Sequence, residues 1–322
     1  AGDDAYDLIA IIDREALNCV VEDMVWYADE VKNIDLTKPY WNHMLNENST
    51  IKGRQVLAYS DMAMTTYDFT HVLTFNKSMI EDLQLESPYD LVSDGTWTLD
   101  KFGEYSTKAL SDLNGDGAYD MSDRYGFVGA AKQIAPCFWI GAGCQSIVKN
   151  DEDIPVFDMS GERMTNALEK AYDLTWGGKT WYVQKEGDWE SSRILFTNDQ
   201  ALFYSATFGD VFHPDMRNMT SDYGIIPYPK YDETQATYYS RVEGGCPYFV
   251  PVTVSDTSFA GAMMEAMACE SYNSVIPVYY EKALKTKFSR DSQSGEILDM
   301  LMQNRVYDWG DTFFTNYVRD GF

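Results

Sequence analysis

Short apolar runs alternate along this chain with segments whose apolar residues repeat at helical spacing. Strands are predicted at 6–12, 54–59, 71–75, 201–204, 223–227 and 248–252. Helices are predicted at 78–85, 99–110, 163–176, 259–270, 276–284 and 296–303. Thr98 is expected to cap the helix at 99–110, because its hydroxyl can accept a hydrogen bond from a free first-turn amide. The alternation predicts an α/β fold.

The length of the chain predicts two lobes. At roughly 150 residues per domain, 322 residues make about two domains. No sequence unit repeats and no low-complexity linker separates two halves, so we expect lobes joined by several crossing strands. No run of 18 apolar residues occurs, so no membrane span is expected.

The charge balance excludes whole classes of partner. The chain has 25 Lys and Arg against 51 Asp and Glu, a net charge of −26. Nucleic-acid phosphates and anionic membrane surfaces would be repelled by such a protein. Neutral ligands, cations and basic partners are compatible with it.

One local motif has the pattern of a calcium-binding loop. Oxygen donors recur at its positions 1, 3, 5, 9 and 12, a glycine stands at position 6, and the residue at position 7 offers its backbone carbonyl. These positions are Asp112, Asn114, Asp116, Gly117, Ala118, Asp120 and Asp123. The pattern predicts a structural calcium site, although Asp123 stands where an EF-hand has the longer Glu. The alternative is a metal-free surface loop built from Asx turns.

Motifs of enzymes and of histidine or cysteine metal sites are missing from the sequence. The spacing of Cys19, Cys137, Cys144, Cys246 and Cys269 fits neither a zinc site nor a disulfide framework, so we expect mostly buried thiols. A Cys137–Cys144 bridge stays open. Nucleophile-elbow, zinc-protease, phosphate-loop and dinucleotide motifs are all absent from the sequence, so these motifs give no indication of an enzyme.

Aromatic residues indicate one class of ligand. Several of them stand beside polar or turn residues rather than in apolar runs, as at 40–42, 138–141, 180–182 and 188–190. Flat rings pack on the C–H faces of sugars while neighbouring polar groups bind hydroxyls, so the pattern is typical of carbohydrate sites. Core packing is the alternative for each tryptophan.

Several segments, taken in order, resemble the extracellular sugar-binding proteins of ABC importers common in Gram-positive gut bacteria. They are 2–9, 35–42, 73–77, 88–92, 95–100, the loop ending at 123–126, 223–230 and 290–294. The resemblance implies a two-lobed periplasmic-binding-protein-like fold with a ligand cleft between lobes that close by a hinge motion. It also implies a membrane permease as partner, a monomer, an extracellular location and, in the full-length protein, a lipid anchor on the outer face of the cytoplasmic membrane.

The resemblance also divides the chain. It assigns residues 1–71 and 249–284 to lobe 1, and 72–248 and 285–322 to lobe 2. The crossings between lobes are expected at 71–76 and 248–252. A strand–helix–strand–helix unit precedes the corresponding first segment in the family, so we expect lobe 1 to be incomplete here, with unpaired strand edges.

The resemblance further implies which residues contact the ligand. On lobe 1 they are Asp13, Arg14, Trp41, Asp61 and Asp68, and on lobe 2 they are Trp139, Ser205, Thr207 and Phe208, followed by Gly245 before the return crossing. Trp139 is expected to stack on the sugar, and Gly245 to let the backbone approach it.

Two other functions stay open. A glycoside hydrolase needs a pair of carboxylates, and such pairs are uninformative among 51 acidic residues. A calcium-stabilised adhesion module would use the loop at 112–123 and bind a protein instead of a small ligand.

Overall fold

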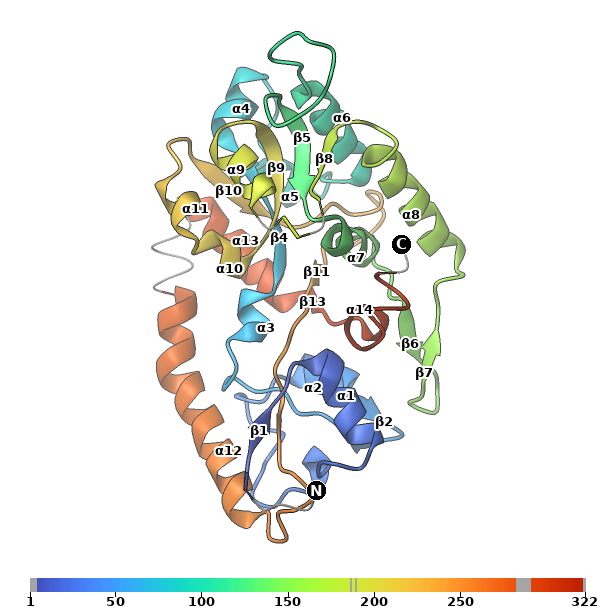
Figure 1. Cartoon of the computed structure of the whole chain (residues 1–322), viewed down its shortest axis with the longest axis vertical. Coiled ribbons are helices and arrows are strands. Elements are labelled where there is room, and N and C mark those ends of the chain that lie inside the picture. Colours follow the sequence, from blue (N-terminus) through green and yellow to red (C-terminus); the bar gives the residue numbers. More distant parts are fainter. Residues whose placement is uncertain (1–4, 186, 189, 282–290, 321–322) are drawn as a thin grey trace.

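A computed structural model describes residues 5–185, 187–188, 190–281 and 291–320. The molecule is elongated, with one lobe above the other and α14 lying between them (Figure 1). Lobe 2, the upper lobe, is built on a five-stranded sheet, and lobe 1 contains the β1–β12 pair. Strands and helices alternate, so the predicted α/β class is confirmed. Within the described ranges, no helix is both long and apolar enough to cross a membrane.

The sheet of lobe 2 has the strand order β10-β4-β9-β5-β8. Its members are β4 (His71–Asn76), β5 (Tyr125–Gly129), β8 (Trp181–Val183), β9 (Ala201–Thr207) and β10 (Tyr223–Ile226). β4 pairs antiparallel with both β10 and β9, whereas β5 pairs parallel with β9 and β8. β4, β5 and β10 are buried throughout, as expected for strands covered on both faces.

Helices pack around this sheet. They are α4 (Lys77–Asp82), α5 (Pro88–Ser93), α6 (Leu99–Ala109), α7 (Ala131–Gly141), α8 (Glu162–Leu174), α9 (Ser191–Thr197), α10 (Phe208–Val211), α11 (Pro214–Asn218) and α13 (Ser292–Gln303). The hydroxyl of Thr98 accepts a hydrogen bond from the Lys101 amide over 3.4 Å, which confirms the predicted cap of α6.

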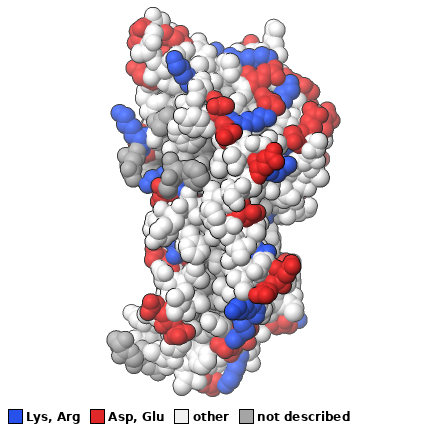
Figure 2. All heavy atoms as spheres, turned by 90° about the vertical axis from the view of Figure 1, so that its right-hand side faces the viewer, with Lys and Arg blue, Asp and Glu red and all other residues white. Residues whose placement is uncertain are grey.

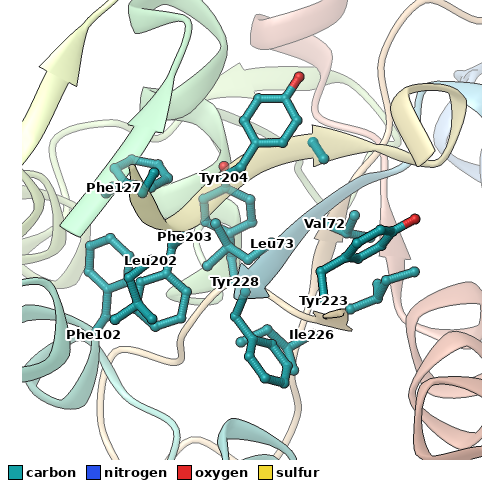
Figure 3. Close-up of a cluster of buried hydrophobic side chains, with 14 of the residues drawn as sticks. Val72, Leu73, Phe102, Phe127, Leu202, Phe203, Tyr204, Tyr223, Ile226 and Tyr228 are labelled. Carbon is teal, nitrogen blue, oxygen red and sulfur yellow. The ribbon is translucent and has the colours of Figure 1, made fainter. Parts of the chain in front are cut away.

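Aromatic rings fill the centre of lobe 2 (Figure 3). Phe102 of α6 contacts Phe127 of β5 edge to face and Phe203 of β9 at a tilt, with ring centroids 5.2 and 5.5 Å apart. Each of these rings is fully buried. The interface joins the helix layer to two neighbouring strands and makes lobe 2 a rigid support for the loops at its lower edge.

Lobe 1 contains short strands and separate helices. Its elements are β1 (Ile9–Ala10), α1 (Asp13–Val21), η1 (Ala28–Glu30), α2 (His43–Asn48), β2 (Thr50–Ile51), β3 (Arg54–Gln55), α3 (Thr65–Asp68), β12 (Tyr248–Phe249), α12 (Ser258–Glu270) and η2 (Ser271–Val275). β1 pairs antiparallel with β12, and β2 with β3. The strands predicted at 6–12 and 54–59 are therefore only two residues long, because the flanking residues pack without a partner strand.

Several elements connect the lobes. α14 (Trp309–Phe313) of lobe 2 packs against α1 of lobe 1, and α10 packs against α3. Within lobe 2, β11 (Ser240–Arg241) pairs parallel with β13 (Arg305–Val306). The hairpin of β6 (Ile147–Lys149) and β7 (Pro155–Phe157) descends from lobe 2 toward β2 (Figure 1). α13 packs on β10 of lobe 2. The lobe boundaries given above stay a prediction, and the last part of the predicted helix at 276–284 lies outside the described residues.

The five cysteines are free thiols, so the open Cys137–Cys144 bridge is not formed. Cys137 is buried, as expected for a small apolar residue, and the other four are partly buried.

Candidate ligand-binding cleft

Two adjoining hollows lie between α1 of lobe 1 and the beginning of α7 in lobe 2. The first, of about 470 Å³, is lined by residues 14–21 of α1 and by the C-terminal segment 313–320. The second, of about 290 Å³, is lined by residues 130–133, 184–185 and 187–188. Arg319 and Asp320 line both hollows, so the two form one cleft with the C-terminal segment along its floor.

The lobe 1 side of the cleft is organised by Asp13, the first residue of α1. Its carboxylate accepts hydrogen bonds from the Tyr307 hydroxyl and from the Arg14 amide, the latter over 2.8 Å. Its backbone amide donates to the carbonyl oxygen of Gly245 over 2.8 Å. Burial raises the pKa of Asp13 to about 7, against these hydrogen bonds, which lower it.

Close packing requires glycine at position 245. A Cβ atom there would lie 2.7 Å from the Tyr59 ring and 3.0 Å from the Asp13 carboxylate. Tyr59 and Tyr307 join hydroxyls over 2.5 Å. Three distant segments thus meet at one carboxylate, which fixes the beginning of α1 and directs the exposed Arg14 into the cleft.

The floor carries paired charges. The Arg319 guanidinium donates to Glu243 over 3.1 Å and to Asp320 over 2.9 Å. Lys132 of α7 approaches Asp320 at 3.9 Å. The side chains at the floor can therefore offer both donors and acceptors to a polar ligand.

A buried ion cluster lies behind the floor. Arg241 is fully buried and donates to Asp311 over 2.5 and 2.8 Å, and it also donates to Glu243. His71 lies 3.2 Å from Glu243 and 2.8 Å from Arg241. Burial opposes the charge of Glu243, but Arg241 and His71 outweigh it and hold the pKa of that carboxyl well below its usual range. The cluster joins β4, β11 and α14, so it fixes the floor to the lobe 2 sheet.

Of the predicted contact residues, only Arg14 lines the hollows, whereas Asp13 and Gly245 are buried next to it and hold the beginning of α1. Asp61 accepts a hydrogen bond from Tyr67 over 2.8 Å and Asp68 accepts one from Tyr279 over 2.7 Å. Neither aspartate lines the two hollows, so the structure gives both a role inside lobe 1.

The two predicted tryptophans are enclosed by protein. Trp41 is 1% exposed and donates to Glu265 over 3.0 Å, and Trp139 is 0% exposed and donates to Asp308 over 3.2 Å. Neither ring presents a face to solvent here. Core packing, the alternative stated above, describes the surroundings of both.

Three more predicted contact residues, at the end of β9 and the beginning of α10, also have internal roles. Ser205 accepts a hydrogen bond from the Tyr228 hydroxyl over 2.5 Å. Thr207 caps α10 in a reciprocal capping box with Asp210, and Phe208 is fully buried. None of the three lines the hollows between the lobes.

Several residues that line the cleft were not predicted from the sequence. Lys132 and Gln133 follow an alanine run at the beginning of α7, and Arg319 and Asp320 lie near the chain end. Arg319 and Asp320 follow an aromatic segment, but they stand at no fixed spacing from another motif that would mark them as ligand-binding residues.

The loop at 112–123 is ordered by Asx turns. Asp112 accepts hydrogen bonds from the Gly115 and Gly117 amides over 2.6 and 2.9 Å. The fully buried Asp123 accepts from the amides of Leu113 and Asp120, each over 2.9 Å. Gly117 has the positive φ of 80° that its turn position requires. Across the described residues, no three His, Cys, Asp or Glu side chains converge in an arrangement that could hold a metal ion.

Comparison with solved structures decides the fold. An ABC substrate-binding protein of Listeria monocytogenes in complex with cycloalternan aligns with a TM-score of 0.63 at 12% identity, covering 99% of this chain and 79% of the other. This chain has the two-lobed fold of the ABC solute-binding proteins. The fold that the sequence resemblance implied is thereby confirmed.

Two further solute-binding proteins align over similar lengths. UgpB of Mycobacterium tuberculosis in complex with glycerophosphocholine gives a TM-score of 0.64 at 16% identity, covering 97% of this chain and 75% of that one. The maltose/maltodextrin-binding domain MalE of Bdellovibrio bacteriovorus bound to maltotriose gives 0.58 at 17% identity, covering 98% and 76%. No protein-family model matches the sequence, and no curated protein does.

Proposed function

We propose that this chain is the solute-binding component of an ABC importer, which binds a carbohydrate between its lobes and delivers it to a membrane permease. The observation that carries the proposal is the polar cleft between α1 and α7 in a two-lobed solute-binding fold. Solved proteins of this fold hold cycloalternan, maltotriose and ribitol. Binding involves no chemical step.

The cleft has groups suited to hydroxyls. Arg14 and Lys132 donate from opposite walls, and Gln133 supplies an amide that both donates and accepts. Phe314 and Tyr317 of the first hollow add apolar surface, with Tyr317 85% exposed. A sugar ring packed on this surface would direct its hydroxyls toward both lobes. Because the closed form makes more hydrogen bonds to the sugar than the open form, binding would favour closure of the lobes.

The test is calorimetric titration of the chain with maltotriose, cycloalternan and ribitol. We expect saturable heat with at least one of them, and a loss of about 10-fold or more in affinity for Arg14→Ala. The control is Arg54→Ala, which removes another exposed arginine of lobe 1 outside the cleft. Equal affinities of both variants, or no binding at all, would contradict the proposed site. Sustained release of reducing sugar would support a glycoside hydrolase instead.

The proposed function also implies where the protein is located and which partner it has. A solute-binding component works outside the cytoplasmic membrane, so we propose an extracellular monomer, lipid-anchored in its full-length form and docking on a permease. The net charge of −26 keeps it apart from anionic lipid headgroups. Size measurement in solution tests the monomer, and a dimer would contradict it.

We propose that the loop at 112–123 binds structural calcium. Its donors are hard oxygens, as calcium requires, and a carboxylate oxygen bonded to an amide keeps a second lone pair. The hydrogen bonds of Asp112 and Asp123 therefore order the loop while leaving acceptor capacity. Figure 2 shows acidic side chains gathered at the upper end of lobe 2, the end from which this loop projects in Figure 1.

A further inference from the structure

A separate hollow of about 510 Å³ lies on lobe 2 between α7 and α8. Ala135 and Phe138 of α7 and Ala171 of α8 form its apolar base, and Leu168 lies beside them. Among the described residues, none that lines this hollow also lines either hollow of the interlobe cleft. Its volume is in the range of small-molecule sites.

Two exposed aromatic rings form one wall of the hollow. Tyr172 is 57% exposed and Trp176 is 41% exposed. Their planes are parallel within 6°, with centroids 6.3 Å apart. Trp176 packs at 73° to the buried Trp181, with ring centroids 4.2 Å apart, so its ring is held in place before any ligand binds. Aromatic faces carry partial negative charge and attract cations.

Two carboxylates line the same hollow as the rings. Glu169, Tyr172 and Asp173 occupy positions i, i+3 and i+4 of α8, which places them along one face of the helix, and Trp176 in the turn after α8 lines the same hollow. Within the described part of the chain, neither Glu169 nor Asp173 has an ion-pair or hydrogen-bond partner for its side chain, and no Lys or Arg lines the hollow. The site therefore combines uncompensated negative charge with apolar surface.

We propose that this hollow binds a small organic cation, an alkylammonium whose carbon substituents pack on the rings while its charge faces the two carboxylates. A neutral sugar would leave both carboxylates without a counter-charge, and an anion would be repelled by them. The overall charge of −26 also raises the local concentration of cations. The site is independent of the function proposed for the interlobe cleft.

The test compares choline with 3,3-dimethylbutan-1-ol, a neutral molecule of the same shape, at 150 mM salt. Binding is followed by tryptophan fluorescence and by calorimetry. We expect saturable binding of choline and at least 10-fold weaker binding of the alcohol. Trp176→Ala and the double variant Glu169→Gln/Asp173→Asn should each weaken choline binding at least 10-fold.

Matched controls separate this site from general attraction. Glu162→Gln removes a carboxylate of the same helix outside the hollow, and Phe259→Ala removes an exposed ring of lobe 1. Both should bind choline like the unchanged chain. Equal binding of choline and the alcohol, no saturation, or equal effects of control and site variants would each overturn the proposal. The double carboxylate variant keeps the rings, so the test holds even where Trp176→Ala does not fold.

Discussion

At the scale of single residues, Arg241 connects the elements that meet between the lobes. It lies on β11, is fully buried and pairs with Asp311 of α14 and with Glu243. Burying three charges costs desolvation energy, and the close geometry of the guanidinium offsets it. Removing one partner leaves the others buried without a counter-charge.

We therefore predict that Arg241→Met lowers the free energy of unfolding by about 3–5 kcal/mol. Urea denaturation measures it. Arg54→Met, which removes an arginine paired with Asp29 and Glu30 on the surface, should leave the midpoint almost unchanged. Similar midpoints for both variants would mean that the buried cluster does not stabilise the junction.

Asp13 makes stability depend on pH. Its pKa rises from the usual 3.8 to about 7 on folding, because the carboxyl is buried. The folded state then binds this proton more tightly than the unfolded state. Stability from Asp13 is complete below pH 4, falls by up to about 1.4 kcal/mol per pH unit as pH rises toward 7, and is constant above that.

Asp13→Asn should remove this fall, because the amide does not titrate. Unfolding midpoints of both proteins between pH 4 and 8 measure it, and the difference between the two curves should change with pH only up to about 7. Parallel curves would show that the carboxyl titrates alike in the folded and unfolded chain.

At the scale of elements, helices and strands with a clear apolar periodicity could be predicted from the sequence. β4, β9, β10, α6, α8 and α12 all appear where strong alternation or apolar runs predict them. α7 was missed because Pro136 inside it suggests a break, and β5 was missed because Gly126 and Gly129 weaken its strand pattern. Gly126 is required by packing, since a Cβ there would lie 2.2 Å from the Ser106 carbonyl oxygen.

The cleft was predictable only in part for a similar reason. Asp13 and Arg14 follow directly after a strand signal, so local sequence places them at a strand end. Lys132 and Arg319 reach the same cleft through long-range packing of α7 and the C-terminal segment. No spacing in the sequence encodes that meeting.

The proposed calcium site lies in the loop between α6 and β5. If calcium binds the folded loop, a chelator should lower the melting temperature of the protein and added calcium should restore it. Asp112→Asn should weaken the response, whereas Asp151→Asn, an exposed acid of another turn, should leave it intact. An identical melting temperature with and without chelator would contradict a calcium site in this loop.

The β6–β7 hairpin of lobe 2 is hydrogen-bonded to the β2–β3 turn of lobe 1, and these contacts are called the hairpin clasp. Lys149 donates to the Thr50 hydroxyl over 2.6 Å and to Asp153 over 2.8 Å. Asp153 in turn accepts from the Gly53 amide over 2.8 Å. Lys149 and the Gly53 amide hold the pKa of Asp153 below its usual range. A strand turn of lobe 1 is thus bound by a hairpin of lobe 2.

Asp153→Ala should open this clasp. The Gly53 amide loses its acceptor, so we predict faster hydrogen exchange there, measured by mass spectrometry of peptides covering 50–55. Peptides from β4 and β9 should exchange as before, because their amides bond within the sheet. Unchanged exchange at Gly53 would show that the hairpin does not hold lobe 1.

At the scale of the whole molecule, the cleft lies between two lobes that differ in how much regular sheet they contain. Lobe 2 has a five-stranded sheet with an aromatic centre, while lobe 1 has two-residue strand pairs. Contacts between the described parts of the two lobes include those of α14 with α1 and of α10 with α3, together with the contacts of the β6–β7 hairpin with the β2–β3 turn. Such connections permit rotation of one lobe on the other without disturbing either core.

We predict that a bound carbohydrate closes the lobes and lowers the radius of gyration. A ligand that contacts Arg14 on one wall and Lys132 on the other makes both contacts only when the walls approach, so binding favours the closed form. Small-angle scattering with and without saturating ligand measures the change. Arg14→Ala should show a smaller decrease at the same ligand concentration, and Asp153→Ala should close at least as far as the unchanged chain. Saturated binding with an unchanged radius would place the ligand on one lobe alone and rule out hinge closure as the response.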